Sequence, residues 1–143
     1  MSAVDGGARL EGGDSSLVLT IEGYEFPEIV GDRWDSNWLF VRADVEHGGQ
    51  RWSEIDAGLT TREGDRIVAW SRSIADGRAI DSPKLSFVEP FLGFELLPDG
   101  RCIRVRAGYG RAVFDVPVDA SALAAFSAAL ARQLERFPHR QGT

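Results

Sequence analysis

The sequence predicts an α+β fold in a single domain: a mainly antiparallel β-sheet with two α-helices packed on one face, giving two layers. Three observations lead to this prediction. Short stretches of alternating apolar and polar residues recur along the chain, as in half-buried strands. Turn signals such as Gly-Gly and Asp-Gly join them, which favours antiparallel neighbours. Two longer stretches carry apolar residues at helical spacing.

The N-terminal part is expected to contain little structure before the first clear strand. Residues 1–16 are small and glycine-rich, and we expect a flexible segment that holds at most a short strand at 8–11. Residues 17–26 then alternate with period two, and Pro27 ends this strand because it lacks a backbone donor. This strand is the expected start of the domain.

A hairpin follows an acidic loop. The loop at 28–36 is rich in Asp and Gly, and residues 37–47 form the next alternating strand. Gly48 and Gly49 are a tight-turn signal, so we expect residues 50–59 to return antiparallel to it.

The first helix is expected at 60–77. Thr60 and Glu63 have the spacing of a capping box, in which each side chain satisfies a free N–H at the helix start. Gly77 suits the position just after the helix end. The apolar stripe expected to face the core consists of Ile67, Trp70 and Ile74.

More strands are expected in the second half of the chain. Asp99 and Gly100 indicate a hairpin turn, and Pro117 indicates an edge strand or a strand end. The strands are expected within residues 84–90, 91–98, 101–110 and 111–119.

The last helix has the clearest amphipathic pattern. It is expected to begin at Asp119 or Ser121, both good N-caps, and to stop at Pro138. Its apolar stripe consists of Leu123, Phe126, Leu130, Leu134 and Phe137.

The composition argues against several functional classes. The formal net charge of −6 disfavours a nucleic-acid binder, which needs basic residues to neutralise phosphates. The single Cys102 forms no internal disulfide or zinc site, and His47 and His139 lack metal-ligand spacing. We therefore expect no catalytic residues, no cofactor and no metal. No signal peptide or membrane span is visible in the sequence, so we expect a cytoplasmic protein.

A binding surface is the better hypothesis, and the acidic loop is the first candidate for it. Trp34 is an aromatic anchor within a charged rim of Glu28, Asp32 and Asp35, and Glu46 lies beside the neighbouring turn. These five residues are the predicted partner-binding residues. Glu89 and Glu95 are the second choice.

Several blocks of the chain resemble one protein family. "GYEFP" (23–27) followed by "WDSNWLFVRADV" (34–45), then "EPFLGFEL" (89–96) and the closing "RFPHR" (136–140), resemble the WapI-type immunity proteins of bacterial polymorphic and contact-dependent toxin systems. The resemblance covers residues 17–140. It implies that the opening block is mainly architectural, with Trp38 packing into the core.

The resemblance also implies a function. An immunity protein binds a cognate toxin domain, a nuclease being one candidate, and neutralises it without enzymatic chemistry. The acidic chain would suit a basic toxin, with no nucleic acid or membrane as partner. The alternative is a small enzyme or a ligand-binding domain with a pocket between sheet and helices.

Overall fold

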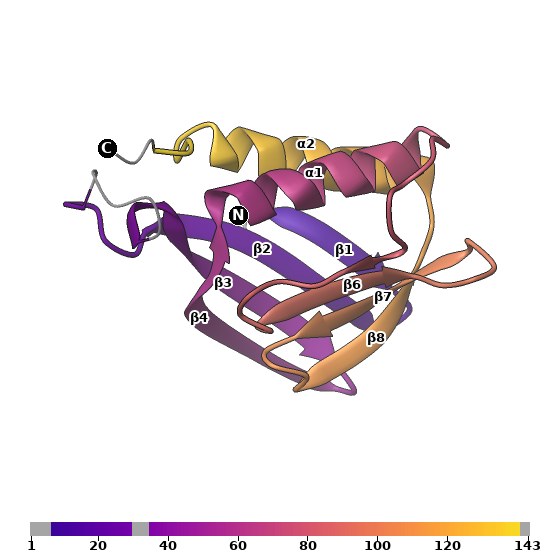
Figure 1. Ribbon diagram of the computed structural model, residues 1–143. Coiled ribbons are helices and arrows are strands. Elements are labelled where there is room, and N and C mark those ends of the chain that lie inside the picture. Colours follow the sequence, from indigo (N-terminus) through magenta and orange to yellow (C-terminus); the bar gives the residue numbers. More distant parts are fainter. Residues whose placement is uncertain (1–6, 30–34, 141–143) are drawn as a thin grey trace.

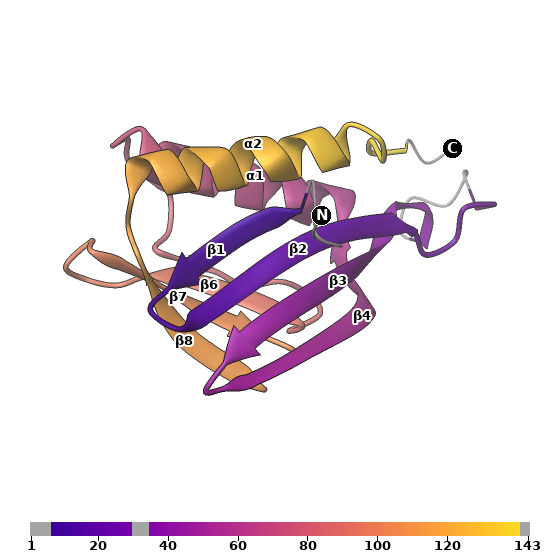
Figure 2. The same ribbon diagram turned by 180° about the vertical axis from the view of Figure 1, so that it is seen from behind.

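The structure is a computed structural model that describes residues 7–29 and 35–140. In this part of the chain, two four-stranded antiparallel sheets and two α-helices form an α+β domain, which confirms the predicted class (Figure 1). The strands are divided between two sheets, however, where one sheet was expected. Both helices lie side by side across one side of these sheets (Figures 1 and 2).

The first sheet has the strand order β1-β2-β3-β4, and the second has the order β5-β6-β7-β8. The strands of the first sheet are β1 (Ala8–Gly12), β2 (Ser15–Tyr24), β3 (Trp38–His47) and β4 (Gln50–Thr60). Those of the second are β5 (Lys84–Leu85), β6 (Leu92–Leu96), β7 (Cys102–Ala107) and β8 (Ala112–Pro117). The helices are α1 (Thr61–Ala75), α2 (Ala120–Leu134) and the short 3₁₀ helix η1 (Asp35–Asn37).

The predicted short strand near the N-terminus is present as β1. It pairs with β2, and its side chains Ala8 and Leu10 are buried in the core. The folded part of the chain thus begins ahead of residue 17, the start predicted from the sequence.

The strand expected at 84–90 is mostly irregular. Only Lys84 and Leu85 pair with β6. Beyond them the backbone is tied to α1 instead of the sheet, because the N–H of Val88 donates to Glu63 Oε2 at 2.9 Å. Pro90 has no N–H with which to continue a ladder.

Both helix starts are capped as the sequence predicts. Thr60 and Glu63 form the complete capping box, with Thr60 N donating to Glu63 Oε1 at 2.9 Å. Asp119, one of the two predicted caps, accepts a hydrogen bond from Ala122 N at 2.8 Å. Gly77 has φ 69° just after α1, which is the left-handed conformation that a helix C′ residue adopts.

The core lies between the two sheets and the helices. The α2 stripe is buried at Leu123, Phe126, Leu130 and Leu134, as predicted, while Phe137 is only partly buried. Alternating residues of β7 and β8 face inward, and β8 is an edge strand of its sheet, as Pro117 indicates. Burying these apolar side chains stabilises the fold by about 25 cal/mol per Å².

The C-terminal tail, residues 137–140, packs against the segment after β2. Tyr24 donates its hydroxyl to Pro138 O at 2.6 Å, and Arg140 N donates to Asn37 Oδ1 at 2.7 Å. His139 is partly buried in this tail, and its Nδ1 lies 2.9 Å from Thr61 Oγ1. The blocks "GYEFP" and "RFPHR" are therefore in contact although more than a hundred residues separate them.

Candidate functional site

The structure describes only part of the predicted partner-binding surface. Glu28 and Glu46 are exposed, but they lie near opposite ends of β3. This strand has ten residues, so its ends are about 30 Å apart at about 3.3 Å per residue. Asp32 and Trp34 lie outside the described residues, and Asp35 opens η1. A binding role for these five residues remains a prediction.

A second candidate surface is centred on Tyr109, in the turn between β7 and β8. Tyr109 has φ 59°, and it is the non-glycine residue with positive φ in the described part of the chain. Its side chain is 46% exposed. A left-handed tyrosine costs about 1–2 kcal/mol, and such strain is retained mostly where a side chain must be held in a particular place.

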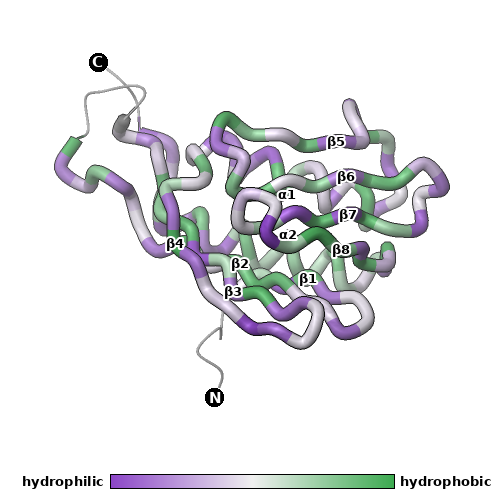
Figure 3. The backbone as a smooth tube through the Cα atoms, turned by 90° about the horizontal axis from the view of Figure 1, so that it is seen from below, coloured by the Kyte–Doolittle hydropathy of each residue, from purple (hydrophilic) through white to green (hydrophobic). Residues whose placement is uncertain are grey.

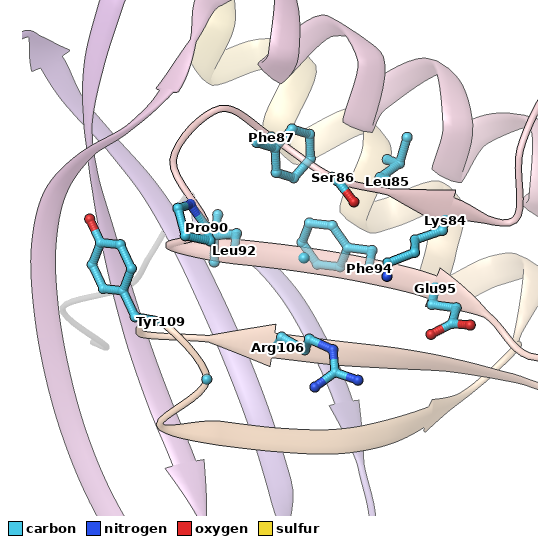
Figure 4. Close-up of a pocket in the computed structure, with 12 residues that line it drawn as sticks. Lys84, Leu85, Ser86, Phe87, Pro90, Leu92, Phe94, Glu95, Arg106 and Tyr109 are labelled. Carbon is cyan, nitrogen blue, oxygen red and sulfur yellow. The ribbon is translucent and has the colours of Figure 1, made fainter.

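One carboxylate is hydrogen-bonded to the Tyr109 hydroxyl, and two others influence it through their charge. That hydroxyl donates to Asp56 Oδ2 on β4, and Figure 4 shows the ring projecting from its turn. Glu54, two residues earlier on the same strand face, and Glu89, in the loop before β6, act on it electrostatically. The hydrogen bond to Asp56, followed by burial and the negative charges, raises the pKa of Tyr109. We call Glu54, Asp56, Glu89 and Tyr109 the Tyr109 patch.

Aromatic packing holds the Tyr109 turn against β4. Phe91, fully buried, meets the Tyr109 ring edge-on at 5.5 Å between centroids. Trp52 of β4 lies against Gly108, where an added Cβ would come within 2.5 Å of its ring. The Arg111 guanidinium stacks over Trp52 at 4.3 Å. The patch is thus presented by two sheets that are fixed to each other at this point.

An open cavity of about 270 Å³ lies beside the patch (Figure 4). Phe87, Pro90 and Tyr109 line one end of it, and Arg106 and Glu95 lie toward the other. Glu95 and Glu89 are the second-choice binding residues predicted from the sequence. Glu95 lies on the outer face of the second sheet, away from the Tyr109 hydroxyl.

Sequence reasoning did not select Tyr109, Glu54 or Asp56. The available signal was "GYGR" (108–111), an aromatic residue between two glycines in a turn. Glu54 and Asp56 gave no signal, because acids on a strand are expected to be solvated. Exposed valine and isoleucine side chains, Val88 and Ile55, also lie on the elements that form the patch.

His47 packs against other side chains of the fold, and Cys102 is a strand residue. His47 Nδ1 lies 2.8 Å from Ser15 Oγ, and its ring stacks on Phe114. Cys102 is partly buried on β7. Among residues 7–29 and 35–140, no group of three or more His, Cys, Asp or Glu residues is placed to hold a metal ion. No helix in this part of the chain is long and apolar enough to cross a membrane.

Comparisons with known proteins give one family match. A family model described as "Immunity protein WapI-like family" matches residues 9–138, nearly the whole chain. The comparison with curated proteins gives no match. Among solved structures, the chain is similar to the plant transcriptional regulator PBF-2, with 17% sequence identity and a TM-score of 0.45. That alignment covers 94% of this chain and 81% of the other.

Proposed function

The chain belongs to the WapI-like immunity protein family, and from this membership we propose that it binds a cognate toxin domain and neutralises it without catalysing a reaction. The toxin domain is basic, and a nuclease is the activity that an acidic inhibitor suits best. The complex forms in the cytoplasm.

The Tyr109 patch is the surface that best supports the binding part of this proposal. It combines a rigid, half-exposed aromatic side chain with three acids, and tyrosine is among the residues most often dominant in protein interfaces. The chain as a whole has a net charge of −6. An acidic surface accelerates association with a basic partner and excludes acidic ones.

Neutralisation by such a surface works through occlusion. Acidic side chains of the patch pair with basic side chains that the toxin uses to hold its substrate, and Tyr109 covers apolar area beside them. The proposed mechanism needs only binding, because a toxin with a covered active site cannot reach its substrate.

The proposal predicts that a neighbouring gene encodes a basic toxin domain, and the test is binding to that domain. The double variant Glu54→Lys with Glu89→Lys should slow association about tenfold or more at low salt and flatten its salt dependence. The matched control is Glu11→Lys with Glu135→Lys, which makes the same charge change at exposed positions elsewhere.

Three outcomes separate the possibilities. Equal slowing by both double variants would mean that only the net charge matters and that the Tyr109 patch is not the contact. If Asp32→Lys with Asp35→Lys alone slows association, the loop predicted from the sequence is the binding face. A toxin domain that does not bind the unmodified chain would refute the proposed function.

A further inference from the structure

The outer edge of β4 is open in the structure. β4 is a terminal strand of the first sheet and pairs with β3 alone. In Figures 1 and 2, β4 lies at the margin of the molecule. In Figure 3, part of the chain at the β4 label has the purple colour of hydrophilic residues. Among the described residues, the other terminal strands differ: β1 and β8 lie against each other, and β5 has two residues.

The turn before β4 determines which of its backbone groups point outward. Gly48 and Gly49 have φ 60° and 77°, as in a two-residue type I′ hairpin turn. The residues flanking such a turn, His47 and Gln50, are a hydrogen-bonded pair. Hydrogen-bonded and non-hydrogen-bonded pairs then alternate along the ladder.

The alternation leaves three residues with outward backbone groups. The register of β3 and β4 is unbroken from His47–Gln50 to Val41–Asp56. Every second residue of this stretch therefore directs its N–H and C=O away from β3: Arg51, Ser53 and Ile55. Ala57, the next position in this series, donates its N–H to its neighbour's side chain, Asp56 Oδ1, at 2.8 Å, as expected for an N–H outside the ladder.

From this edge we propose that β4 accepts an extended segment of a basic protein partner as an added strand, paired with residues 51–56. The side chains of β4 indicate which residue types the added strand carries. Glu54 and Asp56 lie on the face that carries Tyr109, and Ile55, which is 53% exposed, lies on the opposite face. Side chains of neighbouring strands interact directly across a sheet. The added strand therefore alternates basic residues beside the acids with apolar residues beside Ile55.

A second copy of this chain is a poor occupant of the same edge. Two β4 strands paired antiparallel around Ile55 would place Glu54 and Asp56 directly opposite Asp56 and Glu54 of the other copy. Paired around Ser53, they would make the two Glu54 side chains diagonal neighbours. Each chain also carries a net charge of −6. Like charges across a strand pair are destabilising. The bulge after Asp56 also limits the regular edge to six residues.

The first experiment uses the unmodified full-length chain, labelled with ¹⁵N, and measures amide hydrogen exchange. The probe is the peptide acetyl-Thr-Arg-Val-Arg-Val-Arg-Thr-amide. At saturation, exchange at Arg51, Ser53 and Ile55 should slow about tenfold or more, while the amides between them are slow already. Two control peptides replace arginine by glutamate or place the three arginines together, and both should protect these amides less.

The second experiment compares two substitutions at Ser53. Ser53→Ala and Ser53→Pro both remove the hydroxyl that donates to Asp44, but only proline removes the outward N–H. Peptide affinity should fall about tenfold for Ser53→Pro and stay within about twofold for Ser53→Ala. If Ser53→Pro does not fold, the exchange measurement on the unmodified chain decides.

Several results would overturn the inference: no added protection at the three amides, equal protection by the acidic peptide, or equal affinity of the two Ser53 variants. Protection of these amides in the free chain together with a dimer in sedimentation would assign the edge to a second copy. The inference rests on the proposed function only for the identity of the natural partner. A toxin that binds but leaves the three amides unprotected would refute the edge alone, and peptide binding without a toxin would refute the function alone.

Discussion

Replacing Arg140 by alanine should destabilise the protein by about 2–4 kcal/mol. The Arg140 guanidinium donates to three backbone carbonyls, at 2.7 Å to Ser36 O and at 3.0 Å to both Pro27 O and Phe26 O. It also lies 3.7 Å above the Tyr24 ring. These contacts fasten both ends of the segment between β2 and β3 to the C-terminal tail.

The magnitude follows from these contacts. Hydrogen bonds from a charged donor contribute about 1.5–3 kcal/mol each when partly buried, and much less when exposed. The bonds to Phe26 and Ser36 are partly buried and the bond to Pro27 is exposed, so two bonds dominate. Stacking on an aromatic ring near the surface adds about 0.5–1 kcal/mol. Water rehydrates the freed carbonyls, which lowers the total below this sum to about 2–4 kcal/mol.

Urea unfolding followed by tryptophan fluorescence would measure the effect. With a slope of about 2 kcal/mol per M, the midpoint should fall by about 1–2 M. Arg136→Ala is the matched control, because this arginine is exposed just before the same tail, and it should change stability by less than about 0.5 kcal/mol. Equal effects of the two substitutions would refute the assignment of Arg140 as the link between the tail and this segment.

Three other perturbations test the core and the Tyr109 patch. Gly58→Ala should cost about 1–3 kcal/mol, since the new Cβ would lie 2.6 Å from buried Phe91; a stability within 0.5 kcal/mol of the original would show that the ring can move. Leu130→Ala should cost about 2–5 kcal/mol and Ala125→Ser, on the exposed face of α2, less than about 1 kcal/mol; similar costs would contradict the helix orientation. Tyr109 should ionise above its ordinary pKa in an absorbance titration, so the stability it contributes is present below about pH 10 and is lost as the pH rises through the folded-state pKa. Tyr109→Phe should remove a step that lies above about pH 10, and loss of a step at the ordinary tyrosine pKa would contradict the hydrogen bond.

Local features of this chain could be predicted from its sequence because they depend on residues close together along it. The capping box of Thr60 and Glu63, the buried stripe of α2 and the Gly48–Gly49 turn each involve positions within one or two turns or one hairpin. Alternation and helical spacing directly report which side of an element is buried. The blocks that resemble the WapI-type family could be identified in the same way, as short runs of letters.

The division into two sheets, the contact of Arg140 with the segment after β2 and the Tyr109 patch were decided by the tertiary structure. Asp56 and Tyr109 are 53 residues apart, and no periodicity within either strand indicates that they meet. Glu28 and Glu46 are near in sequence and were expected to share a face, but a fully extended strand between them sends them to opposite ends of the sheet. Burial patterns specify which side of a strand faces inward. Which strand lies beside it depends on how all the apolar faces are covered together, and only the folded chain determines that.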